Sequence, residues 1–199
     1  MSTVATGTSP GRAALLSAME ELAREHGVNN VGLREVARRA GLSHAAPTHY
    51  FGSREGMIRA LALEGLALLD TELCTAQEQA AHLPGRERLV ADSLEFVAFA
   101  QRHPAHYDAM FRTPRPAQGD ETLDGARIAA LDGLRALVAD VRAAGEITGD
   151  VETTFLQLCA LSHGLASLAV DGLLHGIEGP ASAEDVVERT IRAQVEQLP

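Results

Sequence analysis

The spacing of apolar residues constrains the fold of this chain more than any other feature. Along almost every segment they recur at intervals of three and four residues, as in the first segment with Ala14, Leu15, Ala18, Met19 and Leu22. This spacing places apolar side chains on one face of an α-helix. We find no convincing run of alternating apolar and polar residues, the pattern of a half-buried strand. The sequence therefore predicts an all-α fold.

Glycines and prolines divide the chain into nine expected helices. Gly27 is a natural stop for the first helix, Gly41 supplies an abrupt turn after the second, and Pro84 with Gly85 breaks the fourth. The expected helices cover residues 11–26, 33–40, a short stretch from 45 or 46, 53–82, 86–102, 104–111, 121–144, 151–174 and 183–198.

Charge is distributed unevenly along the 199 residues, whose net charge is −10. Residues 1–60 contain seven arginines and five acidic residues, a net charge of +2, whereas residues 61–199 contain ten arginines and 22 acidic residues, a net charge of −12. All 17 basic residues are arginines. Only the first part is therefore suited to approach a polyanion, and the acidic remainder would be repelled by nucleic acid.

No segment of the sequence indicates a membrane protein. The opening stretch "MSTVATGTSPGR" has no apolar run able to act as a signal core, and later apolar segments are interrupted by His, Asp and Gly. We expect a cytoplasmic protein with no membrane contact. The two cysteines, Cys74 and Cys159, are 85 positions apart, and we expect buried thiols rather than a disulfide or metal knuckle, with a redox sensor as the alternative.

Two short helices joined by Gly41-Leu42-Ser43 and preceded by a longer helix fit a three-helix helix-turn-helix unit. By spacing alone, an ordinary helical hairpin in a core is equally consistent. Pro47 stands inside the second short helix, where proline is tolerated only in the first turn. We therefore expect that helix to begin at residue 45 or 46, although Ser43 also offers a hydroxyl for capping.

The segment "LREVARRAGLSHAAPTHYFGSREGMI" resembles the DNA-binding segment of the tetracycline-repressor (TetR) family of bacterial transcriptional regulators. The Gly-x-Ser turn, the aromatic pair Tyr50-Phe51 and the "SREGMI" entry into the fourth helix fall at the family's positions. Further along, "RHPAHYDAMF" and "LSHGLASLAVDGL" are similar to a subgroup whose C-terminal domain is called WHG. The resemblance thus covers nearly the whole chain.

The resemblance implies a homodimer with a disordered tail at residues 1–10, a helix-turn-helix domain at 11–53, and a ligand-sensing and dimerisation domain at 54–199. Thr48 and His49 are chosen for contact with base edges, because short donors and acceptors suit the major groove. Tyr50, His44, Arg54 and the region near Arg12 are expected on the phosphate backbone. The complete set of expected DNA-binding residues is Gly32, Ser43, His44, Ala45, Thr48, His49, Tyr50 and Arg54.

Two positions depart from the family pattern. Gly32 stands where the family usually has Ser or Thr, so any phosphate contact there must come from a backbone N–H. Thr48 stands where the subgroup often has tyrosine, so the operator sequence cannot be carried over from relatives. His44 and His49 could form a metal pair, but a spacing of five does not align them on one helical face.

The resemblance places an effector pocket between the helices behind the DNA-binding domain. The expected ligand-binding residues are Phe96, Phe99, His103, Tyr107, Met110, Phe111, Phe155, Cys159 and His163. Core filling is the alternative for each apolar residue. We expect no metal and no cofactor, although His103, His106 and His163 also permit a metal site.

The last two helices are the expected dimer interface, because they carry more apolar surface than a monomer should expose. Its residues are Leu158, Leu161, Leu165, Leu168, Leu173, Val186, Val187, Ile191 and Val195. The functional hypothesis is a non-enzymatic DNA-binding regulator, a repressor released from a palindromic operator by a small, largely apolar ligand. The alternatives are a small helical metal-dependent enzyme using the three histidines, and a ligand-binding protein without DNA recognition.

Overall fold

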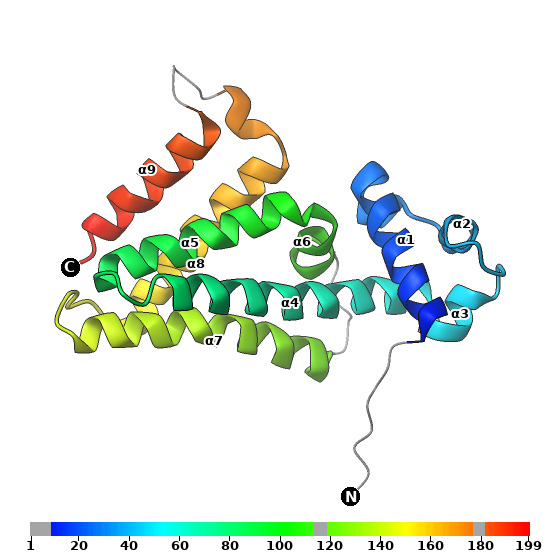
Figure 1. The fold of residues 1–199 in the computed structure, drawn as a ribbon, viewed down its shortest axis with the longest axis horizontal. Coiled ribbons are helices and arrows are strands. Elements are labelled where there is room, and N and C mark those ends of the chain that lie inside the picture. The colour runs from blue at the N-terminus through cyan, green and yellow to red at the C-terminus, as the bar shows by residue number, and fades with distance from the viewer. Residues whose placement is uncertain (1–8, 114–118, 177–181) are drawn as a thin grey trace, which may run out of the picture. The chain divides into compact units, whose positions relative to one another are not determined.

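A computed structural model describes residues 9–113, 119–176 and 182–199, so most of the expected N-terminal tail lies outside the described residues. The described residues form helices joined by turns, with no strand, which confirms the all-α prediction (Figure 1). The elements are α1 Pro10–His26, η1 Val28–Asn30, α2 Leu33–Arg39, α3 Ala46–Phe51, α4 Arg54–Gln79, α5 Gly85–Arg102, α6 Pro104–Phe111, α7 Glu121–Ala143, α8 Val151–Val170, η2 Leu173–Gly176 and α9 Ala183–Glu196.

The expected helix boundaries are close to those observed, with one difference that matters. The eighth helix was expected to run to residue 174, but α8 ends at Val170. Gly172 has a φ of 70°, in the left-handed region that stops an α-helix, and the short η2 follows it. Gly27, with a φ of 81°, ends α1 as expected.

Contacts between Cα atoms divide the chain into two compact units. The N-terminal unit contains residues 1–65 and 105–123, and the C-terminal unit contains residues 66–104 and 124–199. The first part of α4 and nearly all of α6 therefore belong with the helix-turn-helix segment. The expected domain boundary at residue 53 stays a prediction.

The core of the N-terminal unit comes from the inner faces of α1, α2 and α4. Leu15, Leu22, Val36, Met57 and Leu61 are completely buried. Ala14, which was expected on the inner face of α1, is exposed. Burial of four or five such side chains stabilises a unit of this size by about 1.5–3 kcal/mol each before the entropic cost of ordering.

The C-terminal unit is built around α5, which packs against both α8 and α9 (Figure 1). At the start of α5 the guanidinium of Arg86 donates to the backbone carbonyls of Glu146, Val195 and Leu198. The carboxylate of Glu146 accepts from the backbone N–H groups of Gly85 and Arg86. These bonds satisfy the free donors at the start of α5 and the free carbonyls at the end of α9.

Neither cysteine is fully buried, so the prediction of two buried thiols is wrong for Cys74 and only partly met by Cys159. Cys74 is exposed on α4, because its position faces solvent rather than the core, and Cys159 is half-buried on α8. Burial raises the pKa of the Cys159 thiol to about 11, so this group is neutral at physiological pH. Both cysteines are free thiols.

Candidate DNA-binding surface, sensing residues and dimer face

The recognition helix α3 begins where Pro47 predicts. Ala45 is the N-cap and the first full helical turn is closed by the N–H of His49 donating to the carbonyl of Ala45 at 3.0 Å. The carbonyl of Ser43 accepts from the N–H of Ala46 at 3.0 Å. Pro47 therefore forfeits no bond of α3, and its fixed φ suits the first turn. The hydroxyl of Ser43 makes no capping bond to α3, so that alternative is wrong.

The turn between α2 and α3 depends on Gly41. Its φ is 67°, and the next N–H, that of Leu42, donates to the carbonyl of Ala37 at 2.9 Å. This arrangement closes the end of α2 and reverses the chain within a few residues. The conformational reason for a glycine here is therefore confirmed.

Arg39 fixes α2 against α1. Its guanidinium donates to both carboxylate oxygens of Glu25 at 3.0 Å and to Glu21 at 3.3 Å. The hydrogen bond from Arg39 also holds the pKa of Glu25 below its usual value. Since these groups are exposed, the pair orients two helices more than it stabilises them.

The side chains chosen for DNA contact lie together at α3 and the turn before it. Ser43, His44, Ala45, Thr48 and His49 are all exposed. They offer hydroxyl and imidazole groups that can both donate and accept, which is the chemistry that base edges in the major groove require.

The side chain of Tyr50, near the end of α3, is 38% exposed. Its ring makes an edge contact with His49, with 5.0 Å between the centroids. A Cβ added to Gly11 would lie 3.0 Å from the Tyr50 hydroxyl oxygen, so the ring lies against the start of α1. Beside it, the guanidinium of Arg12 stacks on the ring of Phe51, 5.1 Å from its centroid. The start of α1 and α3 thus meet at one surface.

Two arginines of this surface require separate treatment. Arg34, in the first turn of α2 next to Gly32, is exposed and has no ion-pair partner within the described part of the chain. Arg34 is not among the DNA-binding residues expected from the sequence, although its place two residues after the N-cap was a usable signal. Arg54 instead donates to the carbonyls of Val28 and Val31, each at 2.9 Å, and so fixes η1 to the start of α4. Its expected phosphate contact stays untested.

The expected ligand-binding residues are distributed over both units. Phe96, Phe99, His103, Phe155, Cys159 and His163 belong to the C-terminal unit, and Tyr107, Met110 and Phe111 belong to the N-terminal unit. Within the first group the rings of Phe96 and His163 meet edge to face with centroids 4.6 Å apart, and those of Phe99 and His103 are 5.0 Å apart. Burial lowers the pKa of His163, which favours the neutral imidazole.

Asp92 is a buried acid that the sequence analysis missed. Its side chain on α5 is 3% exposed and accepts a hydrogen bond from the amide of Gln77 on α4 at 2.6 Å. Burial raises the pKa of Asp92 to about 6. The usable signal was an acid four residues before Phe96, on an otherwise apolar helix face.

The alternative metal site of His103, His106 and His163 is not supported at His163. Within residues 9–113, 119–176 and 182–199, His163 belongs to no group of three possible metal ligands. The imidazole of His103 instead lies 3.2 Å from a carboxylate oxygen of Glu72 on α4.

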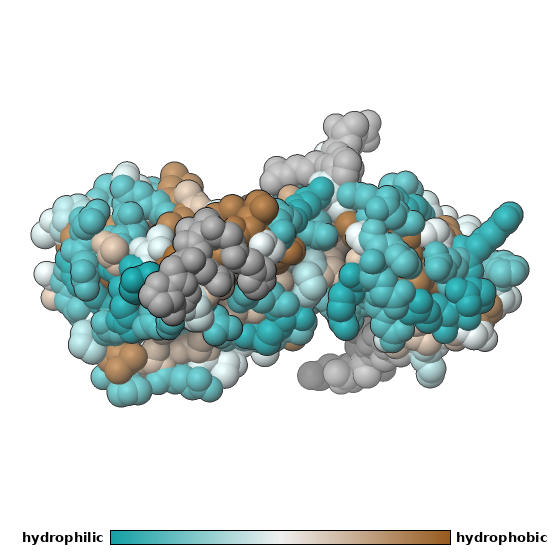
Figure 2. Space-filling model, turned by 90° about the horizontal axis from the view of Figure 1, so that it is seen from above, coloured by the Kyte–Doolittle hydropathy of each residue, from teal (hydrophilic) through white to brown (hydrophobic). Residues whose placement is uncertain are grey.

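The expected dimer face is largely internal. Leu158, Leu165, Val187, Ile191 and Val195 are buried within the subunit, because α5 packs against the inner sides of both α8 and α9. The outer sides of the same helices remain, where Leu156 is 61% exposed, and Leu173 in the following η2 is 58% exposed. Seen from above, hydrophobic patches interrupt the hydrophilic surface of the part that holds α8 and α9 (Figure 2).

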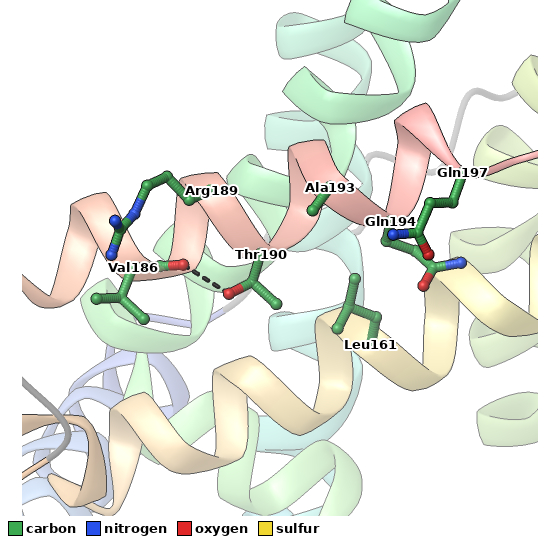
Figure 3. A pocket seen from close by; sticks show the side chains of 7 residues that line it. All are labelled: Leu161, Val186, Arg189, Thr190, Ala193, Gln194 and Gln197. Carbon is green, nitrogen blue, oxygen red and sulfur yellow. Dashed lines mark hydrogen bonds between the residues drawn. The ribbon is translucent and has the colours of Figure 1, made fainter.

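A groove of about 480 Å³ separates α8 from α9 on this outer side (Figure 3). Leu161 of α8 faces Thr190 and Ala193 of α9 across it. Val186 lines the groove further along α9, and its carbonyl accepts from the Thr190 hydroxyl. The polar part of the lining comes from Arg189, Gln194 and Gln197.

The helix α8 is long and apolar enough to cross a membrane, and a third of its apolar stretch is buried in the subunit. Core helices of water-soluble proteins can be equally long and apolar, so these two properties alone are weak evidence for a membrane span.

Comparisons with known proteins agree with this architecture. Residues 15–61 match the family model described as bacterial regulatory proteins of the tetR family, and residues 89–194 match the tetracycline repressor-like C-terminal domain. The description of the C-terminal domain names no subgroup, so the WHG assignment stays a prediction. No curated protein matches the chain.

Solved structures share the fold over nearly the whole chain. A protein of unknown function from Rhodococcus sp. RHA1 is 30% identical, with a TM-score of 0.82 over 98% of this chain and 99% of that one. The TetR family regulator PfmR from Thermus thermophilus is 20% identical, with a TM-score of 0.68 over 93% and 98%. FadR from Bacillus subtilis, solved with stearoyl-CoA, is 12% identical, with a TM-score of 0.73 over 93% and 97%.

The N-terminal match covers the helix-turn-helix segment and the C-terminal match covers more than half of the chain. Together they support a DNA-binding regulator with a ligand-binding C-terminal domain. The chain belongs to the tetracycline-repressor (TetR) family of bacterial regulatory proteins.

Proposed function

We propose that this protein is a cytoplasmic, non-enzymatic repressor that binds a palindromic operator as a homodimer and releases it when a small, largely apolar ligand binds the C-terminal unit. The observation that carries the proposal is the set of exposed hydroxyl and imidazole side chains of Ser43, His44, Thr48 and His49. It stands on a helix whose start is fixed by Gly41 and Pro47.

In this proposal Thr48 and His49 read base edges, and the groups around them hold the phosphate backbone. His44, Tyr50 and the backbone N–H groups after Gly32 remain candidates for phosphate contact. We add Arg34, because its exposed guanidinium has no carboxylate to compete with a phosphate within the described residues. Arg54 is assigned to the support of η1 rather than to DNA.

Dimerisation is proposed through the outer sides of α8 and α9. Exposed Leu156 and Leu173, the half-buried Leu161, and the groove in Figure 3 make up a surface that a second copy would cover. A two-fold dimer would present two copies of α3 to successive major grooves, roughly 34–36 Å apart.

Release by a ligand is proposed to act through α4, which begins beside α3 and continues into the C-terminal unit. A ligand that binds better to one position of α4 changes the separation of the two recognition helices. The aromatic side chains of α5 and α8 favour an apolar ligand, and FadR, crystallised with stearoyl-CoA, gives one example of an apolar-tailed ligand on this fold.

The test is a gel shift on the DNA upstream of the gene, with the wild type and with Thr48→Ala and His49→Ala. Loss of a base contact should weaken operator binding by about 1–3 kcal/mol, roughly 5- to 150-fold. Gln79→Ala, at the far end of α4, is the matched control. Equal binding by all four proteins would refute the assignment of base contacts to α3.

Metal analysis of the purified protein separates the proposal from the enzyme alternative. A stoichiometric bound metal would favour the enzyme. A protein that binds DNA weakly at every salt concentration would instead be a ligand-binding protein without DNA recognition, since true DNA binding weakens steeply as salt rises.

A further inference from the structure

A cavity of about 400 Å³ lies inside the N-terminal unit, separate from the residues expected to bind the effector. It is bounded by η1, by the first half of α4, by α6 with Thr113 just beyond it, and by the start of α7. This volume falls within the roughly 300–1,000 Å³ typical of small-molecule sites. Its lining residues are Asn29, Arg54, Glu55, Ile58, Arg59, Ala62, Ala109, Thr113, Asp120 and Leu123.

The cavity has an apolar floor. Ile58 and Ala62 of α4, Ala109 of α6 and Leu123 of α7 are each at most 8% exposed. These side chains contain only carbon and hydrogen, so the floor suits the apolar part of a ligand.

The charged groups at the rim are not equivalent. Arg59 and Asp120 satisfy each other, because the guanidinium donates twice to the carboxylate. Asp120 also accepts from the N–H of Leu123 and so caps α7. The bonds from Arg59 and Leu123 lower the pKa of Asp120 to about 2, so the pair stays charged and internally neutral.

Arg54 is the cation that remains. Its Nε and one Nη2 hydrogen bind the carbonyls of Val31 and Val28, and within the described residues no carboxylate lies within ion-pair distance of it. An arginine has five N–H donors, so the fork between its two terminal nitrogens is still available. A half-buried guanidinium without a counter-ion, beside an apolar floor, is complementary to a carboxylate that carries an apolar group.

Glu55 is the one rim anion outside the Arg59–Asp120 pair among the described residues that line the cavity. Hydrogen bonds from its own backbone N–H and from Ser53, together with the nearby charge of Arg54, hold its pKa below the usual value. It is exposed, whereas Arg54 is half-buried. Its negative charge therefore weakens the binding of an anionic ligand at the rim, but Glu55 forms no ion pair with Arg54.

We infer that this cavity binds a small amphipathic carboxylate, whose anionic end is held by Arg54 and whose apolar end lies on Ile58, Ala62, Ala109 and Leu123. Because Arg54 also holds η1, which joins α1 to α2, the bound ligand acts directly on the helix-turn-helix unit. The site is additional to the proposed effector site of the C-terminal unit.

The test measures binding of octanoate and of octan-1-ol to the full chain by isothermal titration calorimetry. Octanoate should bind at least tenfold more tightly than octan-1-ol, and this preference should shrink as salt rises. Ala62→Leu and Ala109→Leu, which fill the floor from α4 and from α6, should each weaken octanoate at least tenfold. Ala14→Leu, on the exposed side of α1, should leave it unchanged. Thermal unfolding of each variant checks that it is folded.

Glu55→Gln supplies a change of opposite sign, because removing the rim anion should strengthen octanoate several-fold and leave octan-1-ol unaffected. Equal affinity for the acid and the alcohol would overturn the inference, as would wild-type octanoate binding in both filled variants. DNA binding is measured separately by gel shift. Failure of the chain to bind DNA would refute the proposed function and leave the octanoate result to decide this site.

Discussion

A glycine on the outer side of α8 offers a sharp test of the dimer. Gly164 is helical and exposed, and among the described residues no atom beyond its chain neighbours and the backbone of its own helix lies within 4 Å of a Cβ added to it. Within a single subunit, Gly164→Ala is therefore free of steric cost. It should stabilise the helix by about 0.5–1 kcal/mol, because alanine loses less backbone entropy than glycine.

The expectation changes if α8 packs against a second copy. A glycine beside Ala160 and Leu161 lets two helices approach closely, and an added methyl group there forces them apart. We expect Gly164→Ala to raise the dimer dissociation constant at least tenfold, which corresponds to about 1.4 kcal/mol per dimer. Dimer formation should then add less to the apparent unfolding temperature at a given protein concentration.

Gly125→Ala is the matched control. Gly125 is also helical and exposed, on α7, and its added Cβ would likewise meet no described atom within 4 Å beyond its chain neighbours and its own helix backbone. Sedimentation velocity across a concentration series measures the dissociation constant of both variants, and chemical unfolding measures their stability. If Gly164→Ala and Gly125→Ala dimerise equally well and gain the same stability, the outer side of α8 is not the interface.

Three further changes test the fold and its charges. Arg86→Ala should lower the unfolding free energy by about 2–4 kcal/mol in urea titrations, because three backbone carbonyls lose their donor, whereas exposed Arg142→Ala should change it by less than about 0.5 kcal/mol. Gly56→Ala should destabilise the N-terminal unit and weaken DNA binding in gel shifts, because the added Cβ would lie 2.1 Å from the Phe51 carbonyl oxygen that ends α3. Asp92→Asn should be more stable than the wild type at pH 7 by about 2–3 kcal/mol, since each pKa unit is worth about 1.4 kcal/mol.

The sign of the Asp92 effect follows from its raised pKa of about 6, against an ordinary value of 3.8. Between these two pH values the folded state binds more protons than the unfolded state, so wild-type stability falls as pH rises through this window. The advantage of Asp92→Asn should therefore be absent below about pH 4 and complete above about pH 6. Unfolding in urea at pH 4 and pH 7 measures it, and an advantage that is equal at both values would contradict a buried, proton-linked Asp92.

Local rules predicted the fold and the recognition helix well. Gly41 and Pro47 define the start of α3 through backbone geometry alone, and that geometry is readable from residue type. The end of α8 was mistaken because its apolar pattern continues past Gly172, and periodicity does not register a single positive φ.

Residue type did not reveal which side of a helix meets which neighbour. Leu158 and Ile191 look as suitable for a dimer face as Leu156 and Leu161, but α5 covers the first pair. Arg54 and Arg34 are both arginines near α-helix starts, yet only the tertiary structure supplies the Val28 and Val31 carbonyls that occupy one of them. Such differences arise from packing between segments far apart in the sequence.

The most direct test of DNA recognition by α3 is the ratio of specific to non-specific affinity. Fluorescence anisotropy would compare the wild type with the Thr48→Ala, His49→Ala double variant. The DNA would be a fragment selected from the source genome, together with a shuffled version of it at the same salt concentration. We expect the wild type to prefer the selected fragment by at least about 10³-fold, and we expect the double variant to lose at least tenfold of this preference with non-specific binding unchanged. A preference that is the same in both proteins would contradict recognition by these side chains.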